Sequence, residues 1–172
     1  MSTIRPFSDN VVFMDAEFTS LDPYVGEIIS LALVKADGEE LYLELEFDEK
    51  LLNDWTKENV VPHLRGGKVS REGACRQICE FLGDNKPFLL TYVSQFDTVF
   101  WHKLFGGIEK NPAHWIVVDF ASFLFFNGID PERYLNEQGK LFGISEEGEQ
   151  HNALYDARLL RKSYCAALKQ LS

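Results

Sequence analysis

Two acidic residues separated by a single position, Asp15 and Glu17, follow the apolar run Val11–Met14. Four consecutive apolar residues with polar neighbours are typical of a short strand that is buried on both faces. Because residues two apart in a strand point to the same side, both carboxylates are expected to point together at the end of this strand. Close carboxylates repel each other and are costly to bury, and oxygen-only ligands favour magnesium or manganese. The pair predicts a divalent metal site, and a solvated strand end with two unrelated acids is the alternative.

Three further polar residues lie where strands are expected to end or helices to begin. Asp97 follows an apolar segment at 87–93, and Asp156 lies early in a segment with helical spacing, five residues after His151. Two residues five apart on one helix differ by roughly 140° around its axis, at 3.6 residues per turn. His151 can therefore meet Asp156 at a common site only from a loop or a cap before the helix. A histidine on a loop beside a metal site suits a general base.

The elements that must position these residues predict one α/β domain over residues 1–172. The first third is expected to be a meander of strands, because the alternation at 41–47 and the turn at Asp37-Gly38 are typical of antiparallel pairing. The predicted strands lie at 11–14, 27–34, 41–47, 87–93 and 115–118. The predicted helices lie near 70–82, 97–104, 119–126, 131–142 and 153–171.

Residues 48–70 show no clean period, and Pro62, Gly66 and Gly67 favour a long loop with a short helix near Leu51–Lys57. Positive charge gathers there, which could form a rim that contacts phosphates or simply a solvated loop. The residues concerned are Lys57, His63, Arg65, Lys68 and Arg71.

The composition and net charge limit the kinds of partner that this protein can bind. The 172 residues are 45% hydrophobic, and no apolar run approaches the length of a membrane span. The N-terminus lacks the apolar region of a signal peptide, and three cysteines do not make a disulfide framework, so we expect a cytoplasmic protein without a membrane partner. The net charge of −10 disfavours long duplexes, which are usually bound by a basic face. This charge is compatible with a single strand of nucleic acid that binds at one local site, where metal ions neutralise its phosphates.

Taken together, three motifs resemble those of the DEDDh 3′–5′ exonucleases, the superfamily that includes RNase T, oligoribonuclease and the proofreading exonucleases. They are Asp15-x-Glu17, Asp97 within Tyr92–Asp97, and His151-x-x-x-x-Asp156. Their order and spacing match, and they span most of the chain. The resemblance implies an RNase H-like fold, with a mixed five-stranded sheet flanked by helices.

The resemblance also implies an activity and its site. The family cleaves nucleic acid from the 3′ end and releases nucleoside 5′-monophosphates, with two divalent cations, Mg²⁺ or Mn²⁺, clamping the scissile phosphate. By this likeness Asp15 bridges both ions, Glu17 and Asp156 complete one coordination shell, and Asp97 acts in the other. His151 takes the proton of the attacking water. The terminal nucleotide is held by Phe18, Thr19, Ser20 and Leu21, although Phe18 could instead be a core residue.

The sequence departs from the superfamily at one motif, because many relatives carry His-Asn where this chain has Tyr92 and Val93. The stretches Asp15–Phe18 and Asp97–Gly106 look more like the small single-domain bacterial exoribonucleases of the mycobacterial type, which favours RNA as substrate. A proofreading-type DNA exonuclease and an inactive RNase H-like binding module are the alternatives. Relatives of this size often form homodimers, so a homodimer is a further expectation from the resemblance.

Overall fold

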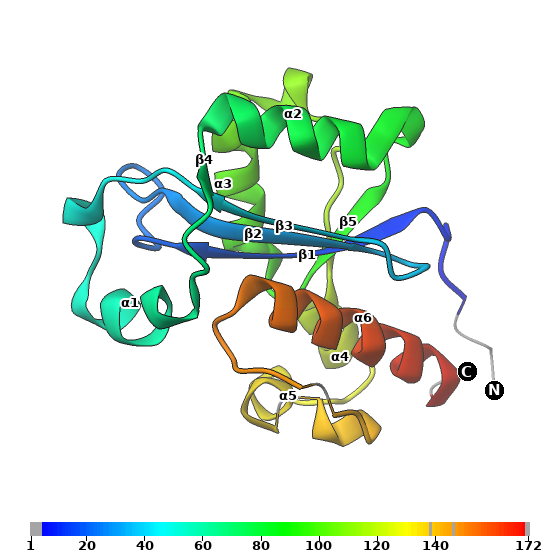
Figure 1. Ribbon diagram of the computed structural model, residues 1–172. Helices are drawn as coiled ribbons and strands as arrows, with labels where there is room; N and C mark the ends of the chain where they lie inside the picture. Colours follow the sequence, from blue (N-terminus) through cyan, green and yellow to red (C-terminus); the bar gives the residue numbers. More distant parts are fainter. Residues whose placement is uncertain (1–4, 138, 146, 171–172) are drawn as a thin grey trace.

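The computed structural model describes residues 5–137, 139–145 and 147–170, and in this part of the chain a six-stranded mixed sheet separates two helical layers (Figure 1). The strand order is β4-β3-β2-β1-β5-β6. The first three strands form the predicted antiparallel meander, whereas β4, β5 and β6 each run parallel to their neighbour. The bounds are β1 Val11–Phe18, β2 Ile28–Lys35, β3 Glu40–Leu45, β4 Lys68–Val69, β5 Phe88–Thr91 and β6 Val118–Asp119.

The prediction of five strands was one short. The additional strand, β4, lies in the segment predicted as a long loop and pairs with β3 through Glu44–Lys68 and Leu45–Val69. Two residues are too few to show a period, so the sequence pattern could not reveal this strand. The same segment holds helix α1, Asp54–Asn59, between 3₁₀ turns at Glu49–Leu51 and Val61–His63.

Strand β1 is longer than its apolar run. It continues to Phe18 because β2 pairs alongside it, with Asp15 opposite Ala32 and Glu17 opposite Ser30. The two acids therefore lie within the strand and not at its end, which corrects the prediction. By alternation they share the face of Phe13, which packs in the core beneath α6.

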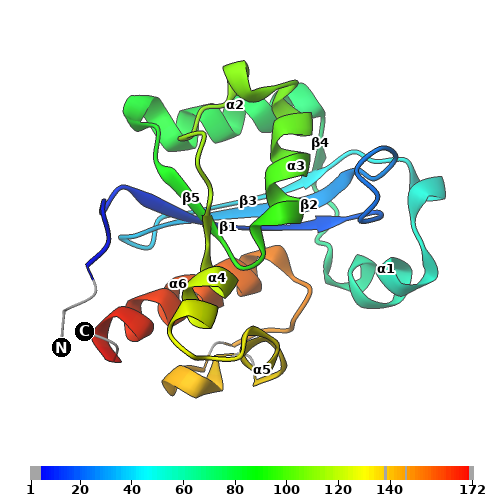
Figure 2. The ribbon, with the colours of Figure 1, turned by 180° about the vertical axis from the view of Figure 1, so that it is seen from behind.

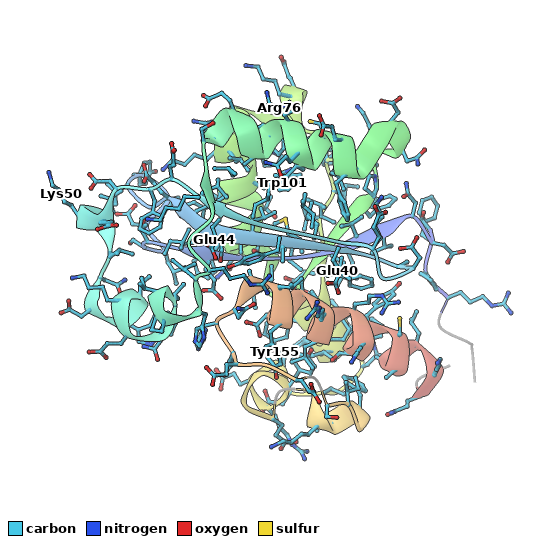
Figure 3. The ribbon with its side chains drawn as sticks, in the orientation of Figure 1. Glu40, Glu44, Lys50, Arg76, Trp101 and Tyr155 are labelled. Carbon is cyan, nitrogen blue, oxygen red and sulfur yellow. The ribbon has the colours of Figure 1, made fainter. Side chains whose placement is uncertain are left out.

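Helices α2, Arg71–Leu82, and α3, Ser94–Phe105, cover one face of the sheet, and Trp101 is fully buried between this sheet face and α2 (Figure 3). Helices α4, Phe120–Phe126, α5, Pro131–Glu137, and α6, Ala153–Gln170, cover the other face (Figures 1 and 2). The two helical layers bury separate cores, so each face of the sheet has its own hydrophobic support.

Other element boundaries also differ from the predictions, among them those of α5 and β6. The helix predicted at 131–142 ends at Glu137, because Gly139 adopts a left-handed backbone with φ of 78° before a 3₁₀ turn at Lys140–Phe142. The strand predicted to begin at Trp115 begins at Val118, where pairing with Leu90 of β5 starts, and Trp115 is 64% exposed.

The parallel pair β1–β5 creates room for a site. It extends only over Val11–Phe13 of β1, so the second half of β1 has no strand neighbour on that side. Helix α3 begins just after β5 ends and brings Asp97, in its first turn, close to this free edge. The end of a short strand thus places a helix start beside the acids of β1.

None of the helices in the described ranges is long and apolar enough to cross a membrane.

Candidate active site

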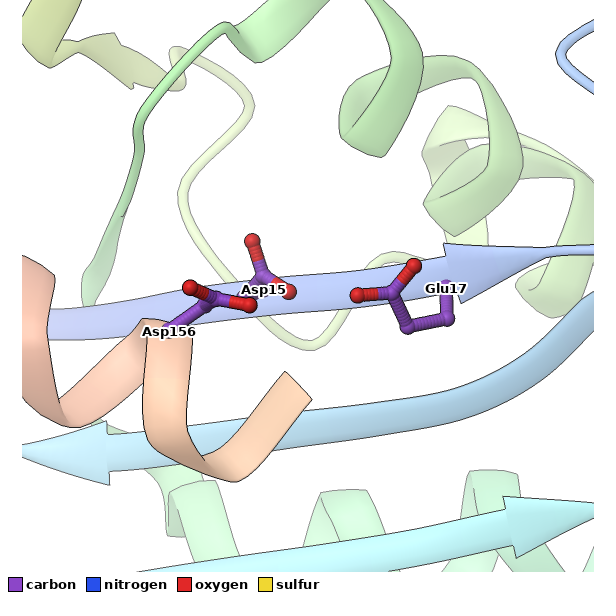
Figure 4. A group of neighbouring side chains, drawn as sticks. All are labelled: Asp15, Glu17 and Asp156. Atoms are coloured by element: carbon purple, nitrogen blue, oxygen red, sulfur yellow. The ribbon is translucent and has the colours of Figure 1, made fainter. Parts of the chain in front are cut away.

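Three carboxylates from two elements meet above the sheet. Asp15 and Glu17 project from β1 and Asp156 projects from the first turn of α6, and each offers an oxygen within 4.8 Å of the others (Figure 4). The start of α6 is set by Asn152, whose Oδ1 accepts the backbone N–H groups of Leu154 and Tyr155, both at 3.2 Å. This cap fixes the turn that carries Asp156 over β1.

Asp97 lies outside that group of three but is close enough to influence it. Its side chain is 7% exposed, and Oδ1 has no hydrogen-bond partner among the described residues. Burial raises the pKa of Asp97 to about 7, although the N–H groups of Asp97 itself and of Ala16 oppose that rise. A buried carboxylate oxygen without a donor is costly unless a cation faces it.

Burial favours the protonated form of these acids, and for Asp15 and Glu17 the neighbouring carboxylates add to that effect. Burial, followed by the charges of Asp156, Glu17 and Asp97, raises the pKa of Asp15 well above its usual value. Burial and the charges of Asp156 and Asp97 raise the pKa of Glu17 to about 8. Burial also raises the pKa of Asp156 to about 7, although the hydrogen bond from the backbone N–H of His151 opposes that rise. The four carboxylates are difficult to ionise together without a cation, and they offer only oxygen ligands. Both properties suit hard divalent cations such as Mg²⁺ or Mn²⁺.

His151 precedes α6 on a loop, as the spacing required. Its backbone is left-handed, with φ of 67°, and its N–H donates to Asp156 Oδ2 at 2.9 Å. Burial and the nearby His63 lower the pKa of the imidazole, which favours its neutral form. A neutral imidazole beside an acidic cluster can accept a proton.

A pocket of about 440 Å³ joins these groups to part of the predicted nucleotide-binding stretch. Phe18, Ser20 and Leu21 line it together with Asp15, Glu17, Asp156 and His151. Leu21 is 54% exposed, whereas Phe18 also stacks on Phe100 with ring centroids 4.2 Å apart and so belongs partly to the core.

Thr19 does not line this pocket. Its side chain is fully buried, and its hydroxyl accepts the backbone N–H of Glu27 at 2.9 Å, which closes the base of the 19–27 loop. The Thr19 side chain therefore shapes the loop, and the place of this residue in the nucleotide-binding stretch stays a prediction.

Sequence reasoning missed several residues of the pocket wall. Asn53, Trp55 and Thr56 come from the segment around α1, and Tyr92, Tyr134 and Gln150 come from other segments. Residues 48–70 lack a period, so the only hint in that region was a tryptophan in a polar stretch. Trp55 is 52% exposed and meets the His151 ring edge to face, with centroids 4.8 Å apart.

The cationic residues of the same region do not form a rim on this pocket, since none of those described lines it. Lys57 pairs with Asp54, Lys68 lies 3.5 Å from Glu49, and Arg71 binds the carbonyls of Leu104 and Lys103. Of the two interpretations left open for these residues, a phosphate-contacting rim and a solvated loop, these contacts favour the solvated loop.

Neither a family model nor a curated protein matches the sequence. Solved structures do match the fold. The nuclease domain of 3′hExo, a DEDDh family member bound to rAMP, aligns over 93% of this chain and 92% of its own, with a TM-score of 0.69 and 13% identity. S. pombe Pop2p in its Mg²⁺- and Mn²⁺-bound form aligns over 92% and 82%, with a TM-score of 0.60 and 15% identity.

Exonuclease I aligns over 92% of this chain with a TM-score of 0.70 and 15% identity, and the match covers 40% of the exonuclease I chain. At these identities the likeness concerns the fold. The protein therefore has the RNase H-like fold of these exonuclease domains, with a mixed sheet flanked by helices.

Proposed function

We propose that this protein is a metal-dependent 3′–5′ exonuclease that hydrolyses phosphodiester bonds at the 3′ end of single-stranded nucleic acid. The observation that carries the proposal is the meeting of Asp15, Glu17 and Asp156 within 4.8 Å, in one pocket with His151. The fold supports it, because the matching structures include exonuclease domains. A fold alone would not suffice, since one fold hosts many functions.

The four acids would hold two divalent cations, Mg²⁺ or Mn²⁺. The raised pKa values, the all-oxygen donor set and the unpartnered Oδ1 of Asp97 support this assignment. Such ions, when bound in this kind of site, lower the pKa of a coordinated water and neutralise charge on the phosphate and the leaving oxygen.

His151 would act as the general base. It accepts a proton from the water whose oxygen attacks the terminal phosphorus, and the 3′ oxygen of the preceding nucleotide leaves. The product is a nucleoside 5′-monophosphate. The lowered pKa of His151 supports this role, because a general base must be unprotonated when the water attacks.

The pocket would receive the terminal nucleotide between the carboxylates and the apolar side chains of Leu21 and Phe18. Its volume of about 440 Å³ lies within the usual range for small-ligand sites. The preference for RNA follows from the resemblance to small bacterial exoribonucleases and requires a contact to the 2′-hydroxyl. The net charge of −10 supports a short single-stranded substrate rather than a long duplex.

The test uses 5′-labelled single-stranded RNA and DNA of equal sequence, each with Mg²⁺ or Mn²⁺, with and without a chelator. We expect a ladder that shortens from the 3′ end, that is faster on RNA, and that disappears with chelator or in Asp15→Asn. A faster ladder on DNA would overturn the sugar preference alone. No cleavage of either strand would contradict the exonuclease function and favour a binding module.

A further inference from the structure

Helix α1 presents an aromatic side chain to the loop that holds His151. The ring centroids of Trp55 and His151 lie 4.8 Å apart with an interplanar angle of 80°, an edge-to-face arrangement that aromatic pairs favour. Both side chains line the pocket of the carboxylates. The two elements are distant in sequence, yet α1 faces the segment that leads into α6 (Figures 1 and 2).

The segment that carries Trp55 is hydrogen-bonded at its start to Glu27, the residue before β2, and at its end to a residue of β3. At its start, the backbone N–H of Asp48 donates to Glu27 Oε2 at 2.8 Å. At its end, the carboxylate of Glu44 accepts the N–H groups of Arg65 and of Gly66, the latter at 2.7 Å. Glu44 lies on β3 and is only 3% exposed (Figure 3). Trp55 is therefore carried by a part of the chain that the sheet holds in place.

A second contact joins the same two segments. His63, which ends the 3₁₀ turn after α1, places Nδ1 at 3.4 Å from Glu149 Oε2 on the loop before α6. This loop holds His151 in the left-handed backbone region, which a residue other than glycine adopts only when its surroundings impose it. The contacts from Trp55 and His63, together with the hydrogen bond from His151 N–H to Asp156, supply such surroundings.

We propose that Trp55 is a positioning residue for the reaction, acting through His151 by fixing the plane of the imidazole beside the carboxylates. This inference rests on the proposed function, in which His151 is the general base. A proton acceptor that is misplaced by about 1 Å can cost about a hundredfold in rate, so the contact is expected to act on turnover. The competing role, a surface on which a nucleotide base stacks, would act on substrate binding instead.

The first experiment is a double-mutant cycle with Trp55→Leu and His151→Gln. We expect Trp55→Leu to lower kcat about ten- to a hundredfold with KM changed less than about twofold, and Trp55→Phe to restore most of the loss. In the His151→Gln background, Trp55→Leu should cause no further loss, because coupled residues are not additive. Trp115→Leu is the control, since Trp115 is 64% exposed and does not line the pocket. Additive losses, or a raised KM with unchanged kcat, would overturn the proposal.

The second experiment does not depend on turnover. The imidazole resonances of His151, assigned by their loss in His151→Gln, are recorded in histidine-labelled protein. We expect a ring-current shift in the wild type that disappears in Trp55→Leu and persists in Trp115→Leu. Unchanged resonances in Trp55→Leu would overturn the positioning role. An inactive wild type that still shows the shift would overturn the exonuclease function while leaving the Trp55–His151 contact demonstrated.

Discussion

Asp15 of β1 and Asp156 of α6, from opposite ends of the chain, place carboxylate oxygens within 4.8 Å of each other. Burial raises the pKa of Asp15 most, and the charge of Asp156 is the next largest cause of that rise. Such a pair weakens the fold unless a cation compensates it. The proposed metal site is therefore expected to cost stability when no cation is bound.

Replacing Asp15 should separate its effect on activity from its effect on stability. We expect Asp15→Asn to lower the exonuclease rate on the order of a thousandfold or more, because several kcal/mol of transition-state stabilisation depend on the metal site. Its melting temperature without metal should equal or exceed that of the wild type at pH 8, since one buried charge is removed. Calorimetry and ladder assays measure both, with exposed Asp84→Asn as the control. An active Asp15→Asn variant would contradict the site.

The metal-free protein should lose stability as pH rises. The folded-state pKa of Glu17 is about 8 and those of Asp97 and Asp156 are about 7, all above the values expected for the unfolded chain. Between about pH 4 and pH 8 the unfolded chain therefore binds fewer protons than the folded protein. Because of this difference, the free energy of unfolding falls as pH rises. We expect the melting temperature in chelator to fall across this range. Glu17→Gln should flatten the curve, and a melting temperature that rises to pH 8 would refute the assignment.

Added Mg²⁺ or Mn²⁺ should raise the melting temperature, because a ligand that binds only the folded state stabilises it. Protons compete for the same carboxylates, so the increase should be larger at pH 8 than at pH 6. Differential scanning fluorimetry at a series of metal concentrations measures the effect. The Asp15→Asn variant should show a much smaller increase, and an equal increase in both proteins would place the binding elsewhere.

The positions of the catalytic candidates could be predicted because each depends on a local pattern. The pair Asp15 and Glu17 needs only strand alternation, and the position of His151 before α6 needs only helical geometry. The meander and the helices α2 and α6 were predictable for the same reason, since alternation and three-four spacing are visible in the residues themselves.

What could not be predicted depends on pairing between distant segments. The length of β1 is set by β2, and β4 exists because β3 offers an edge. The contact of Trp55 with His151 joins two segments without periodicity, so no sequence pattern indicated it. The hydrogen bond between Thr19 and Glu27 was also not indicated by the sequence, because it forms only when the loop closes.

Truncation of Leu21 should weaken substrate binding and leave the fold intact. Its side chain is 54% exposed at the pocket, so truncation removes little core packing. Burying a leucine against a nucleotide contributes about 1.5–3 kcal/mol, which corresponds to a KM about ten- to a hundredfold higher in Leu21→Ala. Steady-state kinetics on short oligonucleotides measure this, with Ile108→Ala, 55% exposed and outside the pocket, as the control. An unchanged KM would remove Leu21 from the binding site.

Gly26 should be required for the shape of the loop that presents Ser20 and Leu21. A Cβ atom at this position would lie 2.2 Å from the carbonyl oxygen of Ser20 and 2.9 Å from both the Asp22 oxygen and Phe100 Cζ. Two of these neighbours are backbone atoms, so the loop itself would have to move. We therefore expect Gly26→Ala to lower kcat/KM by about tenfold or more and to reduce the melting temperature, in keeping with the usual cost of overpacking.

Gly67→Ala is the matched control for this change, because a Cβ there meets nothing within 4 Å. It should leave both the melting temperature and kcat/KM close to those of the wild type. Kinetics measured well below the melting temperature of Gly26→Ala separate a displaced loop from an unfolded protein. If Gly26→Ala were less stable but fully active, the loop would tolerate movement and Ser20 and Leu21 would not need to be held where the structure places them. A loss of activity at a temperature where the protein is folded would instead mean that the closed loop is part of the binding site.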